Sequence, residues 1–283
     1  MFMTDWTQWI GRVETRDDLV TAAPVRGLTA TLDREAAEVI PGMALPPLWH
    51  WLYFLPSERQ SGIGADGHAK RGDFLPPVPL PRRMWAASEF EFRAPVRVGD
   101  AVRRTSTIVD VTHKQGRTGP LAFVKVRHEI RRNDDADPAI VEFHDIVYRQ
   151  ARQPGDVDPP PVVAPPATWQ REIVPDDVLL FRYSALTFNG HRIHYDRRYV
   201  TEVEGYPGLI VHGPLIATLL LDLLRRHRPE ADVAAFSFRA RRPTFDLHPF
   251  SVCAAPDTDP RKVRLWGADH EGWLTMDAVA TLR

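Results

Sequence analysis

Residues 186–196, LTFNGHRIHYD, gather side chains that could perform chemistry. His194 carries an imidazole, which titrates near neutrality and can both take and return a proton. Asn189 cannot remove a proton, but its amide can hold a water molecule or cap a turn of its own backbone. His191 and Asp196 lie beside them. The segment therefore raises three possibilities for His194: a catalytic residue, a metal ligand or a residue of the core.

Two kinds of site receive little support from the pattern. A zinc site could be built from His191, His194 and either His212 or Asp196, but no cysteine pair accompanies them. A Ser184–His194–Asp196 triad would lack the G-x-S-x-G elbow that presents the serine of many hydrolases. The sequence also has no G-x-G-x-x-G or P-loop motif for a nucleotide phosphate. We therefore expect no metal and no cofactor.

A buried helix follows the segment, and we expect it to help to position the site. Residues 213–227, GPLIATLLLDLLRRH, have Pro214 just inside the start and basic residues in the last turn. Apolar residues cover almost all faces of this helix, which is typical of a buried one. Its first N–H groups, that of Gly213 above all, could bind an anionic oxygen, and His212 could cap its start. Tyr183 and Ser184 are expected on a strand leading into the segment.

The other elements are strands separated by turns. Phe-x-Phe-Arg-Ala occurs in 89–102 and again in 235–250, each time followed by a turn and another alternating run. Strict alternation predicts half-buried strands. Further alternating runs cover 103–115, 121–132, 139–150, 250–255, 262–268 and 274–283. Arg82 and Arg83 open one such run and could clamp a carboxylate or a phosphate; the alternative is a solvated strand end.

The chain divides into two similar halves. Residues 154–166, PGDVDPPPVVAPP, hold six prolines in thirteen positions, which favours a stiff connector. We expect a non-catalytic N-terminal domain at 1–153, a linker at 154–166 and a C-terminal domain at 167–283 that carries the site. In the first half ALPPLWHWLYFLP takes the place of the buried helix. This order predicts an α+β double hot-dog fold, in which each antiparallel sheet wraps a central helix; the alternative is two unrelated α+β domains.

The composition excludes several classes of protein. A net charge of −1 gives no general attraction to nucleic acid or to an anionic membrane. Cys253 is the single cysteine and cannot form an internal disulfide, which fits a reducing cytoplasm. The start of the sequence has no secretory signal, and the apolar run 209–224 is too short to span a membrane. We expect a soluble, cytoplasmic protein.

Residues 181–220 resemble the active-site region of the MaoC-like, (R)-specific enoyl-CoA hydratases. Those enzymes carry G-D-x-N-P-x-H, followed by I-V-H-G at the start of the hot-dog helix. Residue by residue, the family's catalytic histidine falls on His194, its catalytic aspartate on Asn189 and its asparagine on His191; IVHG occurs unchanged at 210–213. The form FRYSALTFNxHRIHYD, with LPRRMWAASEFEFRAPVRVGD at 80–100, is similar to the subgroup of mitochondrial-type 3-hydroxyacyl-thioester dehydratases and of itaconyl-CoA and mesaconyl-C4-CoA hydratases.

The resemblance implies a hydro-lyase that adds water to an enoyl thioester. His194 would exchange protons, Asn189 would hold the water, and Gly213 would face the thioester oxygen. His212, Ser184, Tyr183, Arg82 and Arg83 would contact substrate, with His191 and Asp196 in support. A short dicarboxylic C5 substrate, itaconyl-CoA or mesaconyl-C4-CoA, would give citramalyl-CoA. The alternatives are a 3-hydroxyacyl-ACP or -CoA dehydratase and a non-catalytic acyl-thioester binding protein. The N-terminal domain would help to form the acyl pocket. The expected partner is the acyl-CoA itself, and a homodimer or a higher homo-oligomer is the assembly considered.

Overall fold

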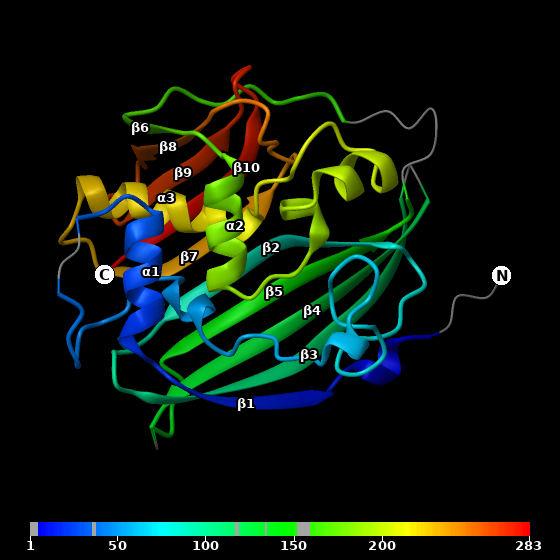
Figure 1. Ribbon diagram of the computed structural model, residues 1–283. Coiled ribbons are helices and arrows are strands. Elements are labelled where there is room, and N and C mark those ends of the chain that lie inside the picture. The colour runs from blue at the N-terminus through cyan, green and yellow to red at the C-terminus, as the bar shows by residue number, and fades with distance from the viewer. Residues whose placement is uncertain (1–4, 36–37, 117–118, 134, 152–158) are drawn as a thin grey trace.

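The computed structural model describes residues 5–35, 38–116, 119–133, 135–151 and 159–283. Ten strands form one continuous antiparallel sheet, which curves around the helices on one of its faces (Figure 1). The strands of the first half are β1 (Val13–Leu19), β2 (Arg82–Phe92), β3 (Ala101–Gly116), β4 (Gly119–Arg132) and β5 (Ile140–Arg149). Those of the second half are β6 (Trp169–Ile173), β7 (Val233–Ala240), β8 (Phe250–Pro256), β9 (Lys262–Ala268) and β10 (Leu274–Leu282).

The strand order shows that the two halves are repeats of one unit. The sheet runs β1-β3-β4-β5-β2-β7-β10-β9-β8-β6, so each half contains its own strands in the order first, third, fourth, fifth, second. The halves join through β2 and β7, where Phe90 pairs with Phe236. These are the first phenylalanines of the two Phe-x-Phe-Arg-Ala sequences, so the pseudo-twofold axis passes between them. The predicted double hot-dog fold is confirmed.

The central helix is present in only one repeat. In the second repeat α3 (Gly213–His227) packs against β6, β8, β9 and β10, and ten of its residues are buried. In the first repeat the corresponding segment forms only the 3-10 turn η2 (Trp49–Leu52). Leu48 and Phe54, on either side of this turn, both have left-handed backbone angles, and Pro46, Pro47 and Pro56 restrict the chain further. The expected central helix of the first repeat, which the prolines of the sequence already shorten and interrupt, is thus reduced to one 3-10 turn.

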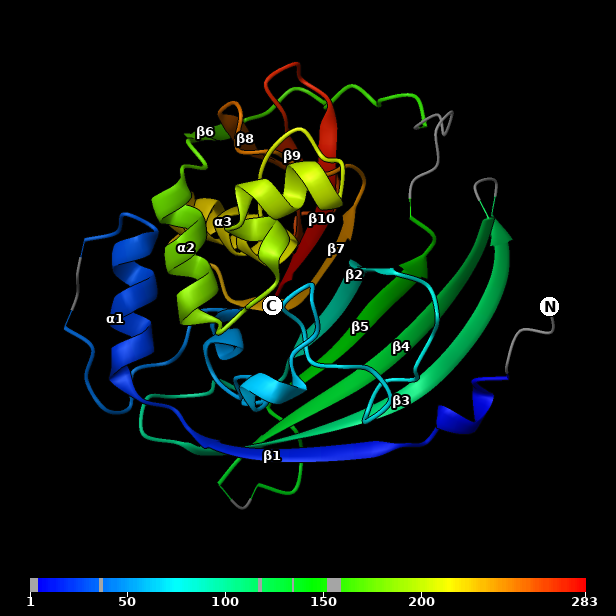
Figure 2. The same cartoon turned by 45° about the vertical axis from the view of Figure 1, so that its right-hand side comes forward.

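Two further helices and two edge strands were not predicted. Helix α1 (Ala22–Thr31) follows β1, and helix α2 (Asp177–Leu186) follows β6. The two helices pack against each other across the two repeats, and Figure 2 shows both on the same side of the sheet as α3. The partly buried positions of β1 are Glu14, Arg16 and Asp18, and its apolar ends are exposed at the edge of the sheet, so no apolar alternation marks this strand in the sequence.

A buried charge on α3 ties the repeats together. The side chain of Asp222 is 0% exposed, and its carboxylate pairs with Arg34 at 2.6 Å, Arg226 at 2.7 Å and Arg171 at 3.3 Å. Arg34 follows α1 of the first repeat, whereas Arg171 lies on β6. A carboxylate removed from water is stable here because three guanidinium groups surround it.

Residues 154–158 of the predicted linker lie outside the described residues. In the described remainder, Ala164 N–H donates to the Gly272 carbonyl at 2.9 Å, so this stretch follows the surface of the second repeat. Among the described residues no helix is long and apolar enough to cross a membrane.

Candidate active site

His194 is held as a neutral base at the end of the short 3-10 turn η4 (Arg192–His194). Its Nδ1 lies 2.7 Å from the carbonyl oxygen of Ile210. A carbonyl only accepts, so Nδ1 must carry the proton, and Nε2 keeps its lone pair in the neutral ring. Burial lowers the pKa of His194 to about 4, although the bond to Ile210 opposes this shift. No described residue hydrogen-bonds to Nε2, so this atom can accept a proton.

A second histidine, His212, packs against the ring of His194. The ring of His212 stacks on that of His194 with 3.7 Å between centroids, and it is 0% exposed. Ser184 Oγ lies 2.8 Å from His212 Nε2, and the Tyr183 ring meets His212 edge-on at 5.1 Å. Tyr183 and Ser184 belong to the last turns of α2 rather than to a strand, so that part of the prediction is wrong. Together these three residues fix the plane of the His194 imidazole.

Asn189 shapes the loop that presents His191. Its Oδ1 accepts from the His191 N–H at 3.0 Å, which is the turn-capping bond that its residue type allows. Phe188, just before it, has a left-handed backbone with φ of 48°. The side chain of Asn189 is half-buried, and its carbonyl oxygen has a second lone pair for a water molecule. Both roles considered for Asn189 are therefore compatible with this geometry.

Asp196 acts on the backbone after the motif. It accepts from the Tyr199 N–H at 3.0 Å and pairs with Arg192 at 2.7 Å. These two contacts lower the pKa of Asp196, the bond from Tyr199 being the larger cause. Asp196 thus orders the segment that follows His194 and does not contact the imidazole.

Helix α3 begins directly beside His194, because His212 is its N-cap residue. The first bond within the helix runs from Ile216 N–H to the His212 carbonyl at 3.1 Å. The N–H groups of Gly213 and Leu215 consequently have no partner within the helix, and no side chain caps this end. A Cβ on Gly213 would come no closer than 3.9 Å to a neighbouring atom. The helix start can therefore donate hydrogen bonds to an oxyanion near His194.

The two predicted arginines at the start of β2 differ in their surroundings. Arg82 Nε lies 3.2 Å from a Glu204 carboxylate oxygen, and its guanidinium lies over the Tyr206 ring at 4.8 Å. Arg83 forms no ion pair with any carboxylate of the described residues. The positive charge of Arg83 lowers the pKa of His68 and of His191, which places it on the side of the motif histidines. Arg83 lies against the Tyr148 hydroxyl, a neutral partner, so its charge rather than that of Arg82 is available to an anion.

The sequence reasoning missed a loop of the first repeat that reaches this site. The His68 ring lies tilted against the His191 ring with 4.0 Å between their centroids, and Asp66 lies beside both histidines. A cavity of about 420 Å³ opens here, lined by Asp66, His68 and Arg83 among others. The stretch GIGADGHAKRG, residues 62–72, has four glycines around an aspartate and a histidine. That density of turn residues beside chemistry-bearing ones was the available signal.

One group among the described residues could hold a metal ion: Asp66, His68 and His191, whose ligand atoms lie within 4.8 Å of one another. It does not include His194 or His212, so it is not the zinc site considered above. Arg71 and Arg83 line the cavity that also contains Asp66 and His68, and their positive charges disfavour a cation there. The chemistry of these surroundings favours an anion, and the absence of a metal stays a prediction.

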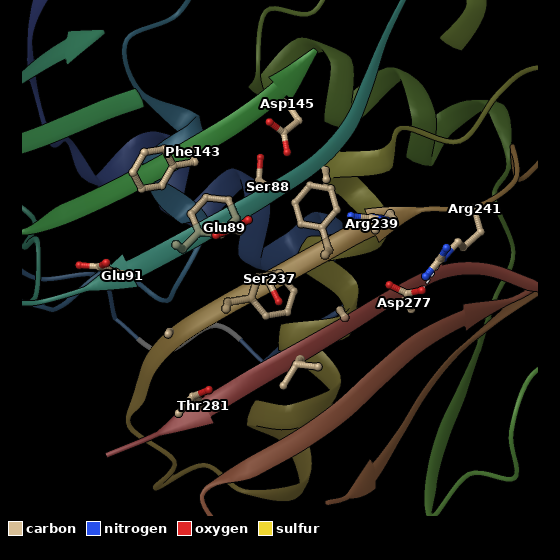
Figure 3. A pocket seen from close by; sticks show the side chains of 17 residues that line it. Ser88, Glu89, Glu91, Phe143, Asp145, Ser237, Arg239, Arg241, Asp277 and Thr281 are labelled. Carbon is tan, nitrogen blue, oxygen red and sulfur yellow. Dashed lines mark hydrogen bonds and ion pairs between the residues drawn. The ribbon is translucent and has the colours of Figure 1, made fainter. Parts of the chain in front are cut away.

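The opposite face of the sheet carries a larger hollow, of about 530 Å³, across β5, β2, β7 and β10. Figure 3 shows it with the helices behind the sheet and with the ion pair between Arg241 and Asp277 at its rim. It contains no histidine and none of the predicted site residues. The hydrolase triad also finds no support, because Ser184 contacts His212 and Asp196 contacts Arg192.

Comparisons with known proteins agree with this geometry. The family model described as hydroxyacyl-thioester dehydratase type 2 matches residues 48–246. Mesaconyl-C(4)-CoA hydratase of Chloroflexus aurantiacus is 46% identical over 284 residues, covering 100% of this chain and 99% of that protein. The mitochondrial hydroxyacyl-thioester dehydratase type 2 of Schizosaccharomyces pombe is 25% identical and covers 83% and 88%. A solved Mycobacterium tuberculosis protein with a double hotdog fold superposes with a TM-score of 0.60 at 13% identity, over 97% of this chain and 96% of that one.

Proposed function

Because this chain belongs to the hydroxyacyl-thioester dehydratase type 2 family, we propose that it is a hydro-lyase whose preferred substrate is mesaconyl-C4-CoA. The enzyme adds water reversibly to the double bond of this short dicarboxylic thioester and forms citramalyl-CoA. The observation that carries the proposal is the full-length identity of 46% to a mesaconyl-C4-CoA hydratase. Itaconyl-CoA, a C5 isomer, is the second substrate to test.

The charges of the site support a dicarboxylic substrate. In mesaconyl-C4-CoA the β-carbon that receives the hydroxyl group also bears the free carboxylate, so this carboxylate lies within a few ångströms of the attacking water. Arg83 lines the cavity beside His68 and has no carboxylate partner among the described residues, and a guanidinium matches a carboxylate well. The hydrocarbon chain of a fatty acyl group would instead leave the charge of Arg83 desolvated and without a counter-charge. The fatty-acid dehydratase alternative is therefore less favoured.

The catalytic roles follow from the geometry around His194. Its Nε2 lone pair takes a proton from water as the water oxygen attacks the β-carbon, and Asn189 helps to hold that water. The electrons of the double bond move onto the thioester oxygen, where the N–H groups at Gly213 stabilise the enolate. His212 and Ser184 keep the His194 ring in place.

We extend the proposal to the setting of the enzyme. A lone, buried Cys253 is compatible with a reducing cytoplasm. The sheet ends at β1 and β6, whose outer edges could pair with a second copy of the chain. Size-exclusion chromatography with light scattering would test for the homo-oligomer.

The substrate is tested by incubating the purified protein with mesaconyl-C4-CoA, itaconyl-CoA and crotonyl-CoA and measuring the masses of the products. We expect the gain of one water molecule, most rapidly with mesaconyl-C4-CoA. Faster hydration of crotonyl-CoA would favour the fatty-acid alternative. Binding of all three thioesters without hydration would instead support a non-catalytic acyl-thioester binding protein.

A further inference from the structure

A loop of the first repeat, residues 64–71, docks directly on the motif segment of the second repeat. The Arg192 N–H donates to the Asp66 carbonyl at 2.9 Å, and the Arg192 guanidinium donates to the Ala65 carbonyl at 3.0 Å. Gly67 and Gly190 touch through their backbones: a Cβ on Gly67 would lie 1.8 Å from the Gly190 carbonyl oxygen. Only glycine fits such an approach. The contact therefore fixes the loop beside the motif.

Within this loop Asp66 and His68 form a carboxylate–imidazole pair. Asp66 Oδ2 lies 3.2 Å from His68 Nδ1, and Asp66 Oδ1 accepts from the His68 N–H at 3.0 Å. Because a carboxylate only accepts, Nδ1 carries the proton and Nε2 of the neutral ring keeps its lone pair. His194 is held in the same tautomer through Ile210. The site thus contains two imidazoles with free Nε2 atoms, one from each repeat.

We infer that His68, held by Asp66, is the second acid–base residue of the hydration and replaces the carboxylate that the motif lacks at Asn189. The inference rests on the proposed hydro-lyase function. His68 is joined to the motif by its ring contact with His191 at 4.0 Å, and the His191 ring meets that of His194 edge-on at 5.4 Å. Asp66 supplies the carboxylate, and it comes from the first repeat, whereas the motif belongs to the second.

The two histidines divide the proton transfers. His194 Nε2 takes a proton from water while the oxygen of that water bonds to the β-carbon and the electron pair of the double bond moves onto the thioester oxygen. The enolate then collapses and takes a proton at the α-carbon from Nε2 of the His68 imidazolium, which the negative charge of Asp66 stabilises. The proton on His194 then passes through solvent to His68, so both histidines return to their starting protonation states.

The charges around His68 explain how it becomes protonated. Burial is the main cause that lowers its pKa, the bond to Asp66 opposes this, and the charges of Arg83 and Arg71 lower it further. The titratable and charged groups around it are Asp66, Lys70 and Arg71 from its own loop, His191 and His194 from the motif, and Arg82, Arg83, Tyr199 and Glu204 from the other walls of the cavity. A substrate carboxylate on Arg83 offsets this positive charge, so binding raises the pKa of His68. Binding of a dicarboxylic thioester therefore favours the protonated form of His68, which is the acid of the reaction.

Binding of an unreactive thioester tests this coupling without turnover. Succinyl-CoA carries a free carboxylate and has no double bond, and butyryl-CoA is its neutral counterpart. Calorimetric titrations at pH 7 in two buffers of different ionisation enthalpy measure the protons taken up. We expect the wild-type protein to take up a larger fraction of a proton with succinyl-CoA than with butyryl-CoA, and His68→Gln to abolish this difference. An equal difference in His68→Gln would overturn the inference.

Kinetics of the same variants complete the test. We expect His68→Gln to lower kcat for mesaconyl-C4-CoA by about 100-fold or more, with a small change in KM. Asp66→Asn can still accept from His68 but bears no charge, so the pKa of His68 falls. The alkaline limb of the pH–kcat profile should therefore shift to lower pH by about one unit. His270→Gln, an exposed histidine on the second repeat, is the matched control and should behave as wild type. Wild-type kcat in His68→Gln would refute the role of His68 while leaving the hydratase function intact; a wild-type protein that hydrates no enoyl-CoA would overturn both.

Discussion

Replacing Gly67 by alanine should separate the two repeats at the active site without unfolding either of them. An ideal Cβ at Gly67 lies 1.8 Å from the carbonyl oxygen of Gly190, and atoms of this kind do not approach closer than 3.0 to 3.4 Å. The loop or the motif must therefore move by about 1.2 to 1.6 Å. The backbone of Gly67 also has φ of 88°, which costs an alanine about 1–2 kcal/mol.

This displacement should affect the rate much more than the fold. A misplacement of about 1 Å in a catalytic constellation can lower the rate by about 100-fold. We expect a loss of this size in kcat for mesaconyl-C4-CoA in Gly67→Ala, because His68 moves with the loop while His194 stays on the second repeat. Thermal unfolding followed by circular dichroism should show only a modest fall in Tm.

Gly62→Ala is the matched control for this experiment. Gly62 belongs to the neighbouring turn η3 (Gln60–Gly62), a Cβ there meets nothing within 4 Å, and its φ is not positive. Its kcat should stay within about twofold of wild type. If Gly67→Ala retained wild-type kcat, or if Gly62→Ala lost as much, the docking of this loop on the motif would not be needed for catalysis.

Four further predictions concern other parts of the molecule. Arg83→Met should lower kcat/KM for mesaconyl-C4-CoA at least tenfold more than for crotonyl-CoA, because only the first substrate loses a charged hydrogen bond. Equal losses on both substrates would show that Arg83 does not recognise the carboxylate. Asn189→Asp should preserve or raise activity, because a carboxylate oxygen can accept from the His191 N–H and from the water molecule at the same time; a loss above about 100-fold would contradict the water-holding role. Asp222→Asn should lower the free energy of unfolding by about 3 kcal/mol in urea titrations, because three guanidinium groups lose their carboxylate; a change below about 1 kcal/mol would contradict that reasoning. Desolvation lowers the pKa values of half-buried His128 and buried His194 to about 4, so below pH 6.5 the unfolded chain binds protons that the folded state does not bind. Stability should be complete above pH 6.5 and fall by about 2 kcal/mol per histidine at pH 5; a Tm that does not fall between pH 7 and 5 would be inconsistent with their desolvation.

Regular alternation allowed most of the sheet to be predicted. The runs 121–132, 139–150, 250–255, 262–268 and 274–283 agree with β4, β5, β8, β9 and β10 to within a few residues. The two Phe-x-Phe-Arg-Ala sequences also mark the strands that meet at the pseudo-twofold axis. Hydrophobic periodicity carries this information locally, so no tertiary context was needed.

The missed elements depend on contacts that periodicity does not record. Tyr183 and Ser184 were expected on a strand, whereas they lie on α2, which Asp176 caps by accepting from the Leu179 N–H at 2.7 Å. Arg82 and Arg83 are adjacent and alike in type, and only the fold gives Arg82 the carboxylate of Glu204. In each case a partner distant in space or a single cap decides the structure.

Only part of the candidate site could be predicted from the sequence, because some of its contacts also join residues distant in the chain. His194, His212 and Gly213 belong to one continuous motif, so their proximity follows from the sequence and is seen in the 3.7 Å stacking of the two rings. His68 lies more than a hundred residues before His194, and its approach depends on the backbone contact between Gly67 and Gly190. A single sequence gives no local sign of such a contact.

The central claim, that this chain hydrates a dicarboxylic enoyl-CoA, is tested most directly by competition in one reaction. Equal amounts of mesaconyl-C4-CoA and crotonyl-CoA are incubated with the wild-type protein, and the masses of both products are followed at early times. Their ratio gives the ratio of the two kcat/KM values. We predict a gain of one water molecule in both substrates, with mesaconyl-C4-CoA favoured by about tenfold or more because its carboxylate meets Arg83. Equal hydration of the two substrates, preference for crotonyl-CoA, or recovery of both thioesters unchanged would contradict the claim.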